Sequence, residues 1–331
     1  MEGKGIFMIM DGKELNSMSN NNQQQKLENR LRDQLDQKKT AIQSNIAKVP
    51  RLLMLEVNNA CNLKCVMCYN PDMIRSKGTM PLEMGLRAIN EAADMGIKEV
   101  TFYTVGEPLI YRDLETLIKE AKRLNLYCYL TSNGLLLNQE TSEMFCEQGL
   151  DSFKFSIDGA NKDEYEAIRV NGNFDKLVEK VKLLKDTRDR MGSNLKIICA
   201  TVLTELNKNS TEDFKKLFGP LSDEIFVSEM TNQGGKMDLN SIKEFGDQEF
   251  SPCRILWDRI VICYDGKITA CCIDFDAELT YDDYNKTSLS EAWNNQVIMK
   301  WRELHMKKDV NDIPLCKDCT LPYTSDIDIF D

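Results

Sequence analysis

Short apolar runs alternate with longer amphipathic segments from about residue 51 to about residue 228 of the chain. Short apolar runs are typical of buried strands, and apolar residues at helical spacing are typical of helices packed on a core. The predicted strands are 52–57, 99–104, 126–131, 152–157, 196–202 and 224–228. The predicted helices are 81–95, 111–124, 138–148, 174–190 and 210–218. Pro81, Asn138 and Ser210 supply helix start signals, and Gly96 and Gly149 supply stop signals.

The alternation of six strands with helices predicts parallel β/α units and therefore an α/β fold. In folds of this class the functional side chains collect at the carboxyl ends of the strands, where loops and helix N-termini meet. We therefore expect the functional side chains directly after the predicted strands.

Two segments flank the β/α region. Residues 1–48 are polar, include the run Ser19-Asn20-Asn21-Asn22-Gln23-Gln24-Gln25, and receive no predicted chemistry. The β/α rhythm stops near residue 245, and an alternating strand at 258–263, a turn at 264–267 and a second strand at 268–273 predict a hairpin beyond it. The sequence thus predicts a polar extension (1–48), a β/α domain (49–245) and a smaller C-terminal domain (246–331).

Composition narrows the possible partners. The 331 residues are 42% hydrophobic, with only 8 Pro and 17 Gly, which is typical of a globular chain. The net charge is −11, from 42 basic and 53 acidic residues, and no local basic patch favours nucleic acid. No run approaches the length of a membrane span, and the first 15 residues lack the apolar core of a signal peptide. We expect a cytoplasmic protein with no nucleic-acid or membrane partner.

Cysteine is the informative residue, because the chain has 12 cysteines and a single histidine, His305. Thiols in a reducing compartment favour metal or iron–sulfur ligation over disulfides. Hydrolytic triads and histidine-rich zinc catalysis need more imidazole than this chain offers. The sequence therefore predicts that the chemistry depends on sulfur.

Cys61, Cys65 and Cys68 follow the first predicted strand with the spacing Cys-x-x-x-Cys-x-x-Cys. A 4Fe-4S cluster takes four ligands, so a loop with three thiolates leaves one iron free to bind a small molecule. A zinc knuckle with a fourth ligand from elsewhere is the alternative interpretation.

This motif resembles that of the radical S-adenosylmethionine (SAM) superfamily, whose members carry it after the first strand of a partial (β/α)6 barrel. Tyr69, directly after the third cysteine, fits the same pattern. The resemblance implies that the free iron binds the amino and carboxylate groups of SAM. It also implies that an external one-electron reductant, such as flavodoxin or ferredoxin, drives cleavage of SAM to a 5'-deoxyadenosyl radical that takes a hydrogen atom from the substrate.

Further segments at the ends of predicted strands are similar to SAM-binding segments of this family. Thr104-Val105-Gly106-Glu107-Pro108 is similar to the Gly-Gly-Glu-Pro segment that receives the SAM amino group, with Val105 at the first Gly. Thr131-Ser132-Asn133-Gly134 and Ser156-Ile157-Asp158-Gly159 follow the next two strands, and Arg169 stands where a family arginine pairs with the SAM carboxylate. The resemblance assigns SAM contacts to Tyr69, Gly106, Glu107, Pro108, Thr131, Asn133, Ser156 and Arg169.

A second set of cysteines lies in the C-terminal region. Cys253, Cys271, Cys316 and Cys319 supply four thiols, enough to close every iron of an auxiliary 4Fe-4S cluster. A zinc site with four cysteine ligands and unligated core thiols are the alternatives. The arrangement resembles the SPASM/twitch extension of some radical SAM proteins, in its single-cluster form, because no cysteine follows Cys319.

Cys271 and Cys272 compete for one ligand position. Adjacent strand residues point to opposite faces, so only one of them can serve. We prefer Cys271 because its spacing from Gly266 matches the family pattern, and we interpret Cys263 as a core thiol.

An auxiliary cluster a short distance from the substrate can coordinate the substrate or accept an electron from the substrate radical. If the substrate carbon bears a hydroxyl or an amine, loss of a hydrogen atom, a proton and an electron yields a carbonyl or an imine. The resemblance to an aminocyclitol dehydrogenase of butirosin biosynthesis implies a carbohydrate or cyclitol substrate. Candidate bases are Glu229, Asp258 and Asp274, and Arg254 and Arg259 are candidates to hold the substrate.

Two alternatives stay open, one within the enzymes and one from another class. Peptide modification, by thioether formation or epimerisation, is common among SPASM-type proteins, although residues 1–48 show no clear strand pattern of a leader-binding domain. A non-catalytic iron–sulfur or zinc protein would neither bind nor cleave SAM. His305 lies on a predicted C-terminal helix, and we interpret it as a surface or packing residue.

Overall fold

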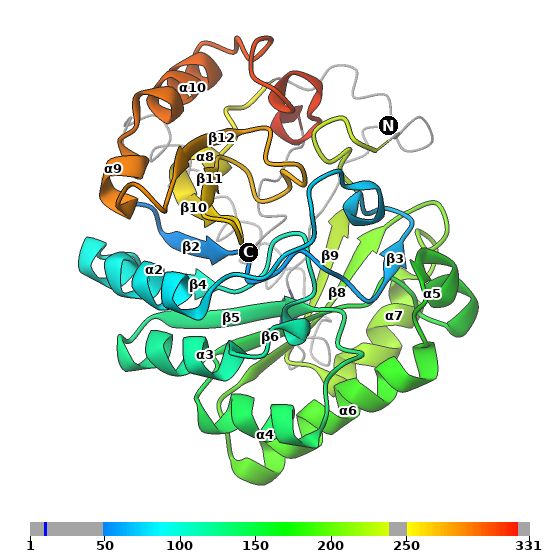
Figure 1. Cartoon of the computed structure of the whole chain (residues 1–331). Helices are drawn as coiled ribbons and strands as arrows, with labels where there is room; N and C mark the ends of the chain where they lie inside the picture. Colours follow the sequence, from blue (N-terminus) through cyan, green and yellow to red (C-terminus); the bar gives the residue numbers. More distant parts are fainter. Residues whose placement is uncertain (1–9, 12–48, 238–249, 324–331) are drawn as a thin grey trace, which may run out of the picture.

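The computed structural model describes residues 10–11, 49–237 and 250–323, and its centre is a parallel sheet. Six strands run parallel in the order in which they follow along the chain. They are β2 (Leu52–Leu55), β4 (Glu99–Thr101), β5 (Tyr127–Ser132), β6 (Ser152–Ser156), β8 (Lys196–Leu203) and β9 (Glu224–Glu229). The predicted α/β class and the partial (β/α)6 barrel are confirmed (Figure 1).

Each predicted helix forms, with boundaries within a few residues of those expected. They are α2 (Leu82–Met95), α3 (Leu114–Arg123), α4 (Gln139–Glu147), α6 (Phe174–Met191) and α7 (Thr211–Phe218). The boundary signals work as predicted: Asn138 accepts the Thr141 N–H at 2.8 Å, and Gly96 ends α2 in the left-handed conformation. The short helix α5 (Lys162–Ile168), capped by Asn161, was not predicted.

The two faces of the central sheet pack against different parts of the chain. Leu53 and Leu55 of β2 belong to the main core, which the flanking helices share. Leu52 and Met54 point to the opposite face and pack in a smaller cluster with Cys253 and other C-terminal residues. Because successive side chains of β2 point to opposite faces, one set packs in the main core and the other packs against the C-terminal region at the inner face of the barrel.

The C-terminal region extends the same sheet. β10 (Arg259–Ile262) runs parallel to β2, with Ile262 opposite Leu55, and β11 (Lys267–Thr269) and β12 (Thr280–Asp283) continue the sheet antiparallel. The predicted hairpin is confirmed, but its second strand ends at Thr269, because the chain turns there and Ala270 donates to the carbonyl of Leu279. Three helices complete this region: α8 (Ile255–Asp258), α9 (Leu289–Trp293) and α10 (Gln296–Met306).

Short elements complete the described chain. β1 (Met10–Asp11) pairs antiparallel with β9, so part of the predicted polar extension joins the sheet edge. The remainder of residues 1–48 and the predicted boundary at 245/246 lie outside the described residues. The two-residue strands β3 (Lys64–Cys65) and β7 (Arg169–Val170) form a separate antiparallel pair. The 3-10 helices are η1 (Asn70–Asp72), η2 (Pro108–Ile110), η3 (Gly219–Leu221), η4 (Cys316–Asp318) and η5 (Leu321–Tyr323).

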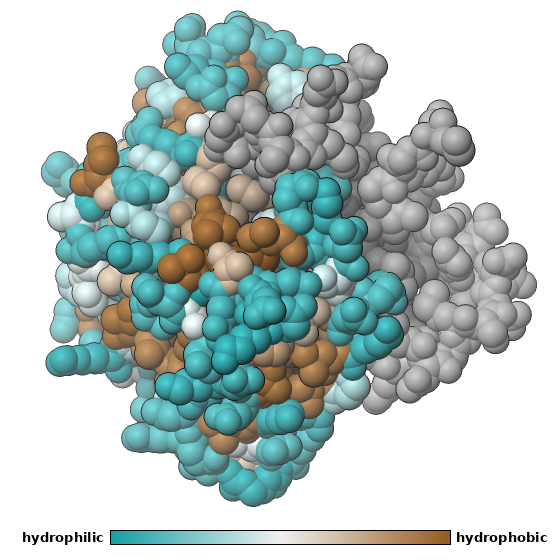
Figure 2. Space-filling model, turned by 90° about the vertical axis from the view of Figure 1, so that its right-hand side faces the viewer, coloured by the Kyte–Doolittle hydropathy of each residue, from teal (hydrophilic) through white to brown (hydrophobic). Residues whose placement is uncertain are grey.

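Hydrophilic residues cover much of the surface, as expected from the charged composition. On the face shown in Figure 2, they surround separate hydrophobic patches. Among the helices of the described residues, we find none with the length and apolar character needed to traverse a bilayer.

Candidate active site

Cys61, Cys65 and Cys68 lie in the loop that follows β2, at the carboxyl edge of the sheet. Pairing of β3 with β7 places Cys65 opposite Arg169. The Cys68 N–H donates to the carbonyl of Cys65 at 3.0 Å, which closes a tight turn between these two ligand candidates. The three predicted thiols are thus presented by one ordered loop.

Burial keeps these thiols in the neutral form. It raises the pKa of Cys61 and Cys65, and it raises the pKa of Cys68 to about 11. Negative charge on Cys61 and Cys65 would raise the pKa of Cys68 further. Such a group of thiols fits a cationic iron centre, since metal coordination deprotonates a thiol outright.

Glu107 fixes the turn that follows β5. Its buried carboxylate accepts hydrogen bonds from the Ser132 hydroxyl at 2.7 Å, from the Asn133 N–H at 2.9 Å and from the Leu109 N–H at 3.0 Å. Burial raises the pKa of Glu107, and these three donors oppose that rise. The side chain predicted to meet the SAM amino group therefore also joins the loops after β4 and β5.

Gly106 is required by a close backbone approach. A Cβ atom at this position would lie 2.3 Å from the carbonyl oxygen of Asn58. Asn58 in turn donates from Nδ2 to the carbonyl of Glu107 at 2.9 Å, and Pro108 begins η2 directly afterwards. The Gly-Glu-Pro segment consequently packs against the start of the cysteine loop.

The other predicted SAM contacts also lie at the carboxyl ends of strands. Thr131 lies near the end of β5, and its buried Oγ1 has no hydrogen-bond partner among the described residues. Ser156 ends β6 and is half-buried. Asn133 donates from Nδ2 to Asn62 of the cysteine loop at 2.8 Å. The structure therefore brings the predicted cluster and SAM residues to one edge of the sheet.

Arg169 has a partner that the sequence did not reveal. Its guanidinium forms a buried ion pair with Asp158, at 2.8 Å from Nε to Oδ2, and Asp158 also accepts the Val202 N–H. Asp158 adopts a positive φ of 67°. Burial raises the pKa of Cys65 and the positive charge of Arg169 opposes that rise, and the β3–β7 pairing places this ion pair beside the cysteine loop.

Sequence analysis missed the segment that follows β9. Gln233 donates from Nε2 to the Met67 carbonyl at 2.7 Å and accepts the Tyr69 N–H at 3.1 Å. The neighbouring Asn232 exchanges hydrogen bonds with Thr320, directly after Cys319. Two adjacent side chains therefore tie the first cysteine loop to the C-terminal cysteines. The run Gln233-Gly234-Gly235, which follows the last barrel strand β9, is the sequence signal that could have marked this segment.

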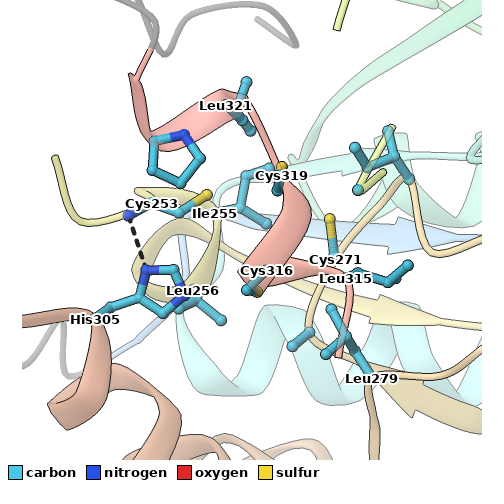
Figure 3. A pocket seen from close by; sticks show the side chains of 14 residues that line it. Cys253, Ile255, Leu256, Cys271, Leu279, His305, Leu315, Cys316, Cys319 and Leu321 are labelled. Carbon is cyan, nitrogen blue, oxygen red and sulfur yellow. Dashed lines mark hydrogen bonds between the residues drawn. The ribbon is translucent and has the colours of Figure 1, made fainter. Parts of the chain in front are cut away.

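The four cysteines predicted for the auxiliary cluster line one cavity (Figure 3). Cys253 precedes α8, Cys271 follows β11, Cys316 lies in η4 and Cys319 follows it. Burial raises the pKa of Cys253 to about 12 and raises the pKa of Cys319. The thiols are spread around the cavity, and no three acidic, thiol or imidazole groups in the described part of the chain converge on a single-ion site.

Cys272 differs from Cys271 in its surroundings. Cys271 lines the cavity, whereas Cys272 does not, and both pack in or against the cluster that contains Leu52 and Met54. A hydrogen bond from Cys271 and the positive charge of Arg259 lower the pKa of Cys272 to about 7. The geometry supports Cys271 as the ligand candidate, as the sequence spacing favoured.

One short segment connects the cavity to the first cysteine loop. Ile273, two residues after Cys271, packs against the residues around both sites. The Phe275 ring lies 5.8 Å from the ring of Tyr69 and is buried against Met73. The two candidate sites are therefore joined by continuous packing.

Two of the three candidate bases have structural roles. Asp258 pairs with Arg51 at 2.9 Å and with Arg259 at 2.8 Å, and although burial raises its pKa, the arginines hold the pKa of that carboxyl well below its usual range. It lies at the amino end of β10, whereas the cysteine loop follows the carboxyl end of β2. Asp258 is thus a poor base at the wrong edge of the sheet, and Arg259 is buried against it instead of facing a substrate.

Asp274 stabilises the turn after β11. Its buried carboxylate accepts from the Thr269 hydroxyl and from the backbone N–H groups of Glu278 and Leu279 at 2.9 and 2.8 Å. Glu229 ends β9 at the carboxyl edge and is half-buried. Its position leaves Glu229 as the base candidate that best fits the site.

His305 is not a surface residue. It is fully buried and lines the cavity with the four cysteines. Of the two predicted alternatives, surface or packing, the surface position is wrong and packing is confirmed, because α10 places this side chain between Phe250 and Trp257.

Comparisons with known proteins agree with this geometry. A model of the radical SAM superfamily matches residues 55–218, and a model of an iron–sulfur cluster-binding domain, SPASM, matches residues 253–320. The GTP 3',8-cyclase of Clostridium perfringens strain SM101 is 31% identical over 172 residues, which is 50% of each chain. The PqqA peptide cyclase of Granulibacter bethesdensis is 29% identical over 139 residues, 41% of this chain and 37% of the cyclase. The chain thus spans about half or less of the length of these curated relatives.

Solved structures share the fold at low sequence identity. BtrN in complex with AdoMet and 2-DOIA is 16% identical, with a TM-score of 0.58 over 83% of this chain and 94% of BtrN. Streptococcus suis SuiB bound to precursor peptide SuiA is also 16% identical, with a TM-score of 0.66 over 86% of this chain and 72% of SuiB.

The family models specify the cofactors. A radical SAM domain uses SAM and a 4Fe-4S cluster, and a SPASM domain binds an auxiliary iron–sulfur cluster. The thiols of the described residues form two groups that fit these two requirements. The chain belongs to the radical SAM superfamily and carries a C-terminal SPASM domain.

Proposed function

We propose that this radical SAM enzyme oxidises a hydroxyl- or amine-bearing carbon of a carbohydrate or aminocyclitol by two electrons. The observation that carries the proposal is the single cavity lined by Cys253, Cys271, Cys316 and Cys319. Four thiols can occupy every iron of an auxiliary cluster, which favours electron acceptance over substrate ligation. BtrN, solved in complex with AdoMet and 2-DOIA, shares the fold over 94% of its chain, which supports a similar architecture.

The residues of the chain form two sites with different roles. Cys61, Cys65 and Cys68 would hold the first cluster, and the loops joined by Glu107 would receive SAM. When bound, SAM and the first cluster supply the hydrogen-abstracting radical, and the auxiliary cluster accepts the remaining electron. The substrate loses one hydrogen atom, one proton and one electron in total, and becomes a carbonyl or an imine. Glu229 would take the proton.

Packing supports transfer of that electron between the sites. Ile273 contacts the residues around both cysteine groups, and the Phe275 ring meets Tyr69. The side chains of Asn232 and Gln233 hold the two cysteine segments together through hydrogen bonds to the backbone at Thr320 and Met67. A substrate bound at the carboxyl edge of the sheet would therefore lie near both clusters. A flavodoxin or ferredoxin is the reductant class that we propose.

Peptide modification is the second candidate function. The observation that favours it is the similarity to the fold of SuiB in its complex with precursor peptide SuiA, at a TM-score of 0.66. The partial match to a PqqA peptide cyclase points in the same direction. The two candidates differ in substrate class and in product, because a thioether or epimer leaves no new carbonyl.

The test is anaerobic. The protein is reconstituted with iron and sulfide, reduced with dithionite and assayed for 5'-deoxyadenosine from SAM, beside a Cys61/Cys65/Cys68 triple alanine variant. We expect about eight irons in the parent, about four in the variant, and 5'-deoxyadenosine from the parent alone. Absence of 5'-deoxyadenosine from the fully loaded parent with every substrate class supplied would refute the catalytic proposal.

Substrate class is then decided by mass spectrometry. Sugars, aminocyclitols and cysteine-containing peptides are compared for stimulation of 5'-deoxyadenosine formation. A sugar or cyclitol product that has lost two hydrogen atoms supports the dehydrogenase. A modified peptide with no carbohydrate turnover supports the second candidate instead.

A further inference from the structure

His305 of α10 reaches the cavity that the four C-terminal cysteines line (Figure 3). The side chain is completely buried, and its Nδ1 accepts a hydrogen bond from the backbone N–H of Cys253 at 3.3 Å. The rings of Phe250 and Trp257, with centroids 5.9 and 6.5 Å away, hold the imidazole in place.

The hydrogen bond to Nδ1 fixes the position of the ring proton. Because Nδ1 uses its lone pair to accept the Cys253 N–H, the neutral imidazole carries its proton on Nε2. Nε2 is buried and has no hydrogen-bond partner among the described residues. A buried N–H donor without an acceptor is costly, so a partner is expected in the cavity.

The cavity itself offers sulfur as the acceptor. Apart from the four thiols, its lining near His305 consists of apolar side chains such as Ile255, Leu256 and Leu321. None of these apolar side chains can accept a hydrogen bond, whereas the sulfur of a cysteinate or a sulfide can.

We propose that the Nε2–H of His305 donates a hydrogen bond to a sulfur atom of the auxiliary cluster and thereby raises the reduction potential of that cluster. This inference rests on the proposed function, since it requires a cluster in the cavity. A hydrogen bond to sulfur stabilises the more negative, reduced state, and such bonds are among the factors that set cluster potentials. His305 is thus a positioning residue that makes the cluster a better electron acceptor.

Two amide substitutions separate the roles of the two ring nitrogens. In His305→Asn the amide oxygen replaces Nδ1 and keeps the acceptor for Cys253, but no donor reaches the cavity. In His305→Gln the longer amide places a donor near the Nε2 position. His305→Leu removes both functions. If His305 served only to accept the Cys253 N–H, the asparagine variant would be the least perturbed of the three.

The measurement is a redox titration of the auxiliary cluster, followed by electron paramagnetic resonance. It uses the full chain with Cys61, Cys65 and Cys68 replaced by alanine, so that only this cluster contributes to the signal. We expect the glutamine variant to keep the parent potential. The asparagine and leucine variants should lower it by about 59 mV, a tenfold change in a one-electron equilibrium.

Iron content separates the possible failures. Equal potentials in the parent, asparagine and glutamine proteins would overturn the role of His305 while leaving the cluster in place. Loss of about four irons in both amide variants would instead make His305 a ligand and also overturn the inference. A parent that binds zinc or no iron in this cavity would overturn the proposed electron-accepting function and, with it, the hydrogen bond.

Discussion

Replacement of Glu107 by leucine tests whether this carboxylate organises the SAM-binding edge. Leucine nearly fills the space but accepts no hydrogen bond, so the Ser132 hydroxyl and the N–H groups of Leu109 and Asn133 lose their partner. Each buried donor left without a partner costs about 1–3 kcal/mol, and the Ser132 hydroxyl can rotate to another acceptor. The two backbone donors therefore set an expected loss of about 2–6 kcal/mol.

Glutamine at the same position gives a graded comparison. Its amide oxygen still accepts, but its amino group faces a donor, which costs about 1–2 kcal/mol. Removal of the charge offsets part of that cost, because burial raises the pKa of Glu107 and so disfavours the ionised form. The expected order of stability is parent, then glutamine, then leucine.

The assay is thermal unfolding under anaerobic conditions, with and without SAM. With an unfolding entropy of about 2.1 cal/mol/K per residue, each kcal/mol shifts the Tm of a 331-residue chain by about 1.4 °C, so the leucine variant should unfold about 3–8 °C below the parent. It should also bind SAM more weakly, because Asn133 ties this turn to Asn62 of the cysteine loop. Glu179→Gln, an exposed position on α6, is the matched control and should change Tm by less than about 1 °C. If the leucine variant matched this control in both Tm and SAM affinity, the role of Glu107 in joining the loops after β4 and β5 would be refuted.

Three further outcomes follow from the same geometry. Cys271→Ala should lose about four of eight irons and Cys272→Ala none, as measured by iron analysis; the opposite pattern would reverse the ligand assignment. Gly106→Ala should lose about 1–3 kcal/mol of stability to the clash with Asn58, as followed by thermal unfolding, and an unchanged Tm would contradict the close approach. Because the pKa of Asp258 is lowered in the fold, its contribution is full above the usual aspartate pKa and lost as pH falls through the lowered value. Asp258→Asn should therefore flatten the acid side of the stability profile measured by urea unfolding, with no loss specific to catalysis.

Local patterns account for what sequence analysis predicted correctly. The six parallel strands and five of the barrel helices follow from apolar periodicity and from boundary residues such as Asn138 and Gly96. The preference for Cys271 over Cys272 rests on its spacing from Gly266 and stays a prediction, although of the two only Cys271 lines the cavity. Such features depend on residues within a few positions of one another, and the chain alone encodes them.

Contacts between residues far apart in the chain account for what sequence analysis missed. Asp258 was a candidate base in sequence terms, but it meets Arg51 across 207 positions and becomes part of an ion-pair cluster. Gln233 meets Tyr69 across 164 positions, and no periodicity near either residue indicates that contact. These pairings depend on how the strands are ordered in the sheet, and that order is not visible in any local stretch of sequence.

The sequence by itself determined the α/β alternation, the three-cysteine loop and the inventory of thiols, because spacing and periodicity are properties of the chain. Only the tertiary structure decided that β10 joins β2, that four separated cysteines line one cavity, and that His305 accompanies them. The physical reason is that burial and hydrogen-bond satisfaction act on the packed molecule. A side chain acquires its partner, and so its chemistry, only when the sheet brings remote segments together.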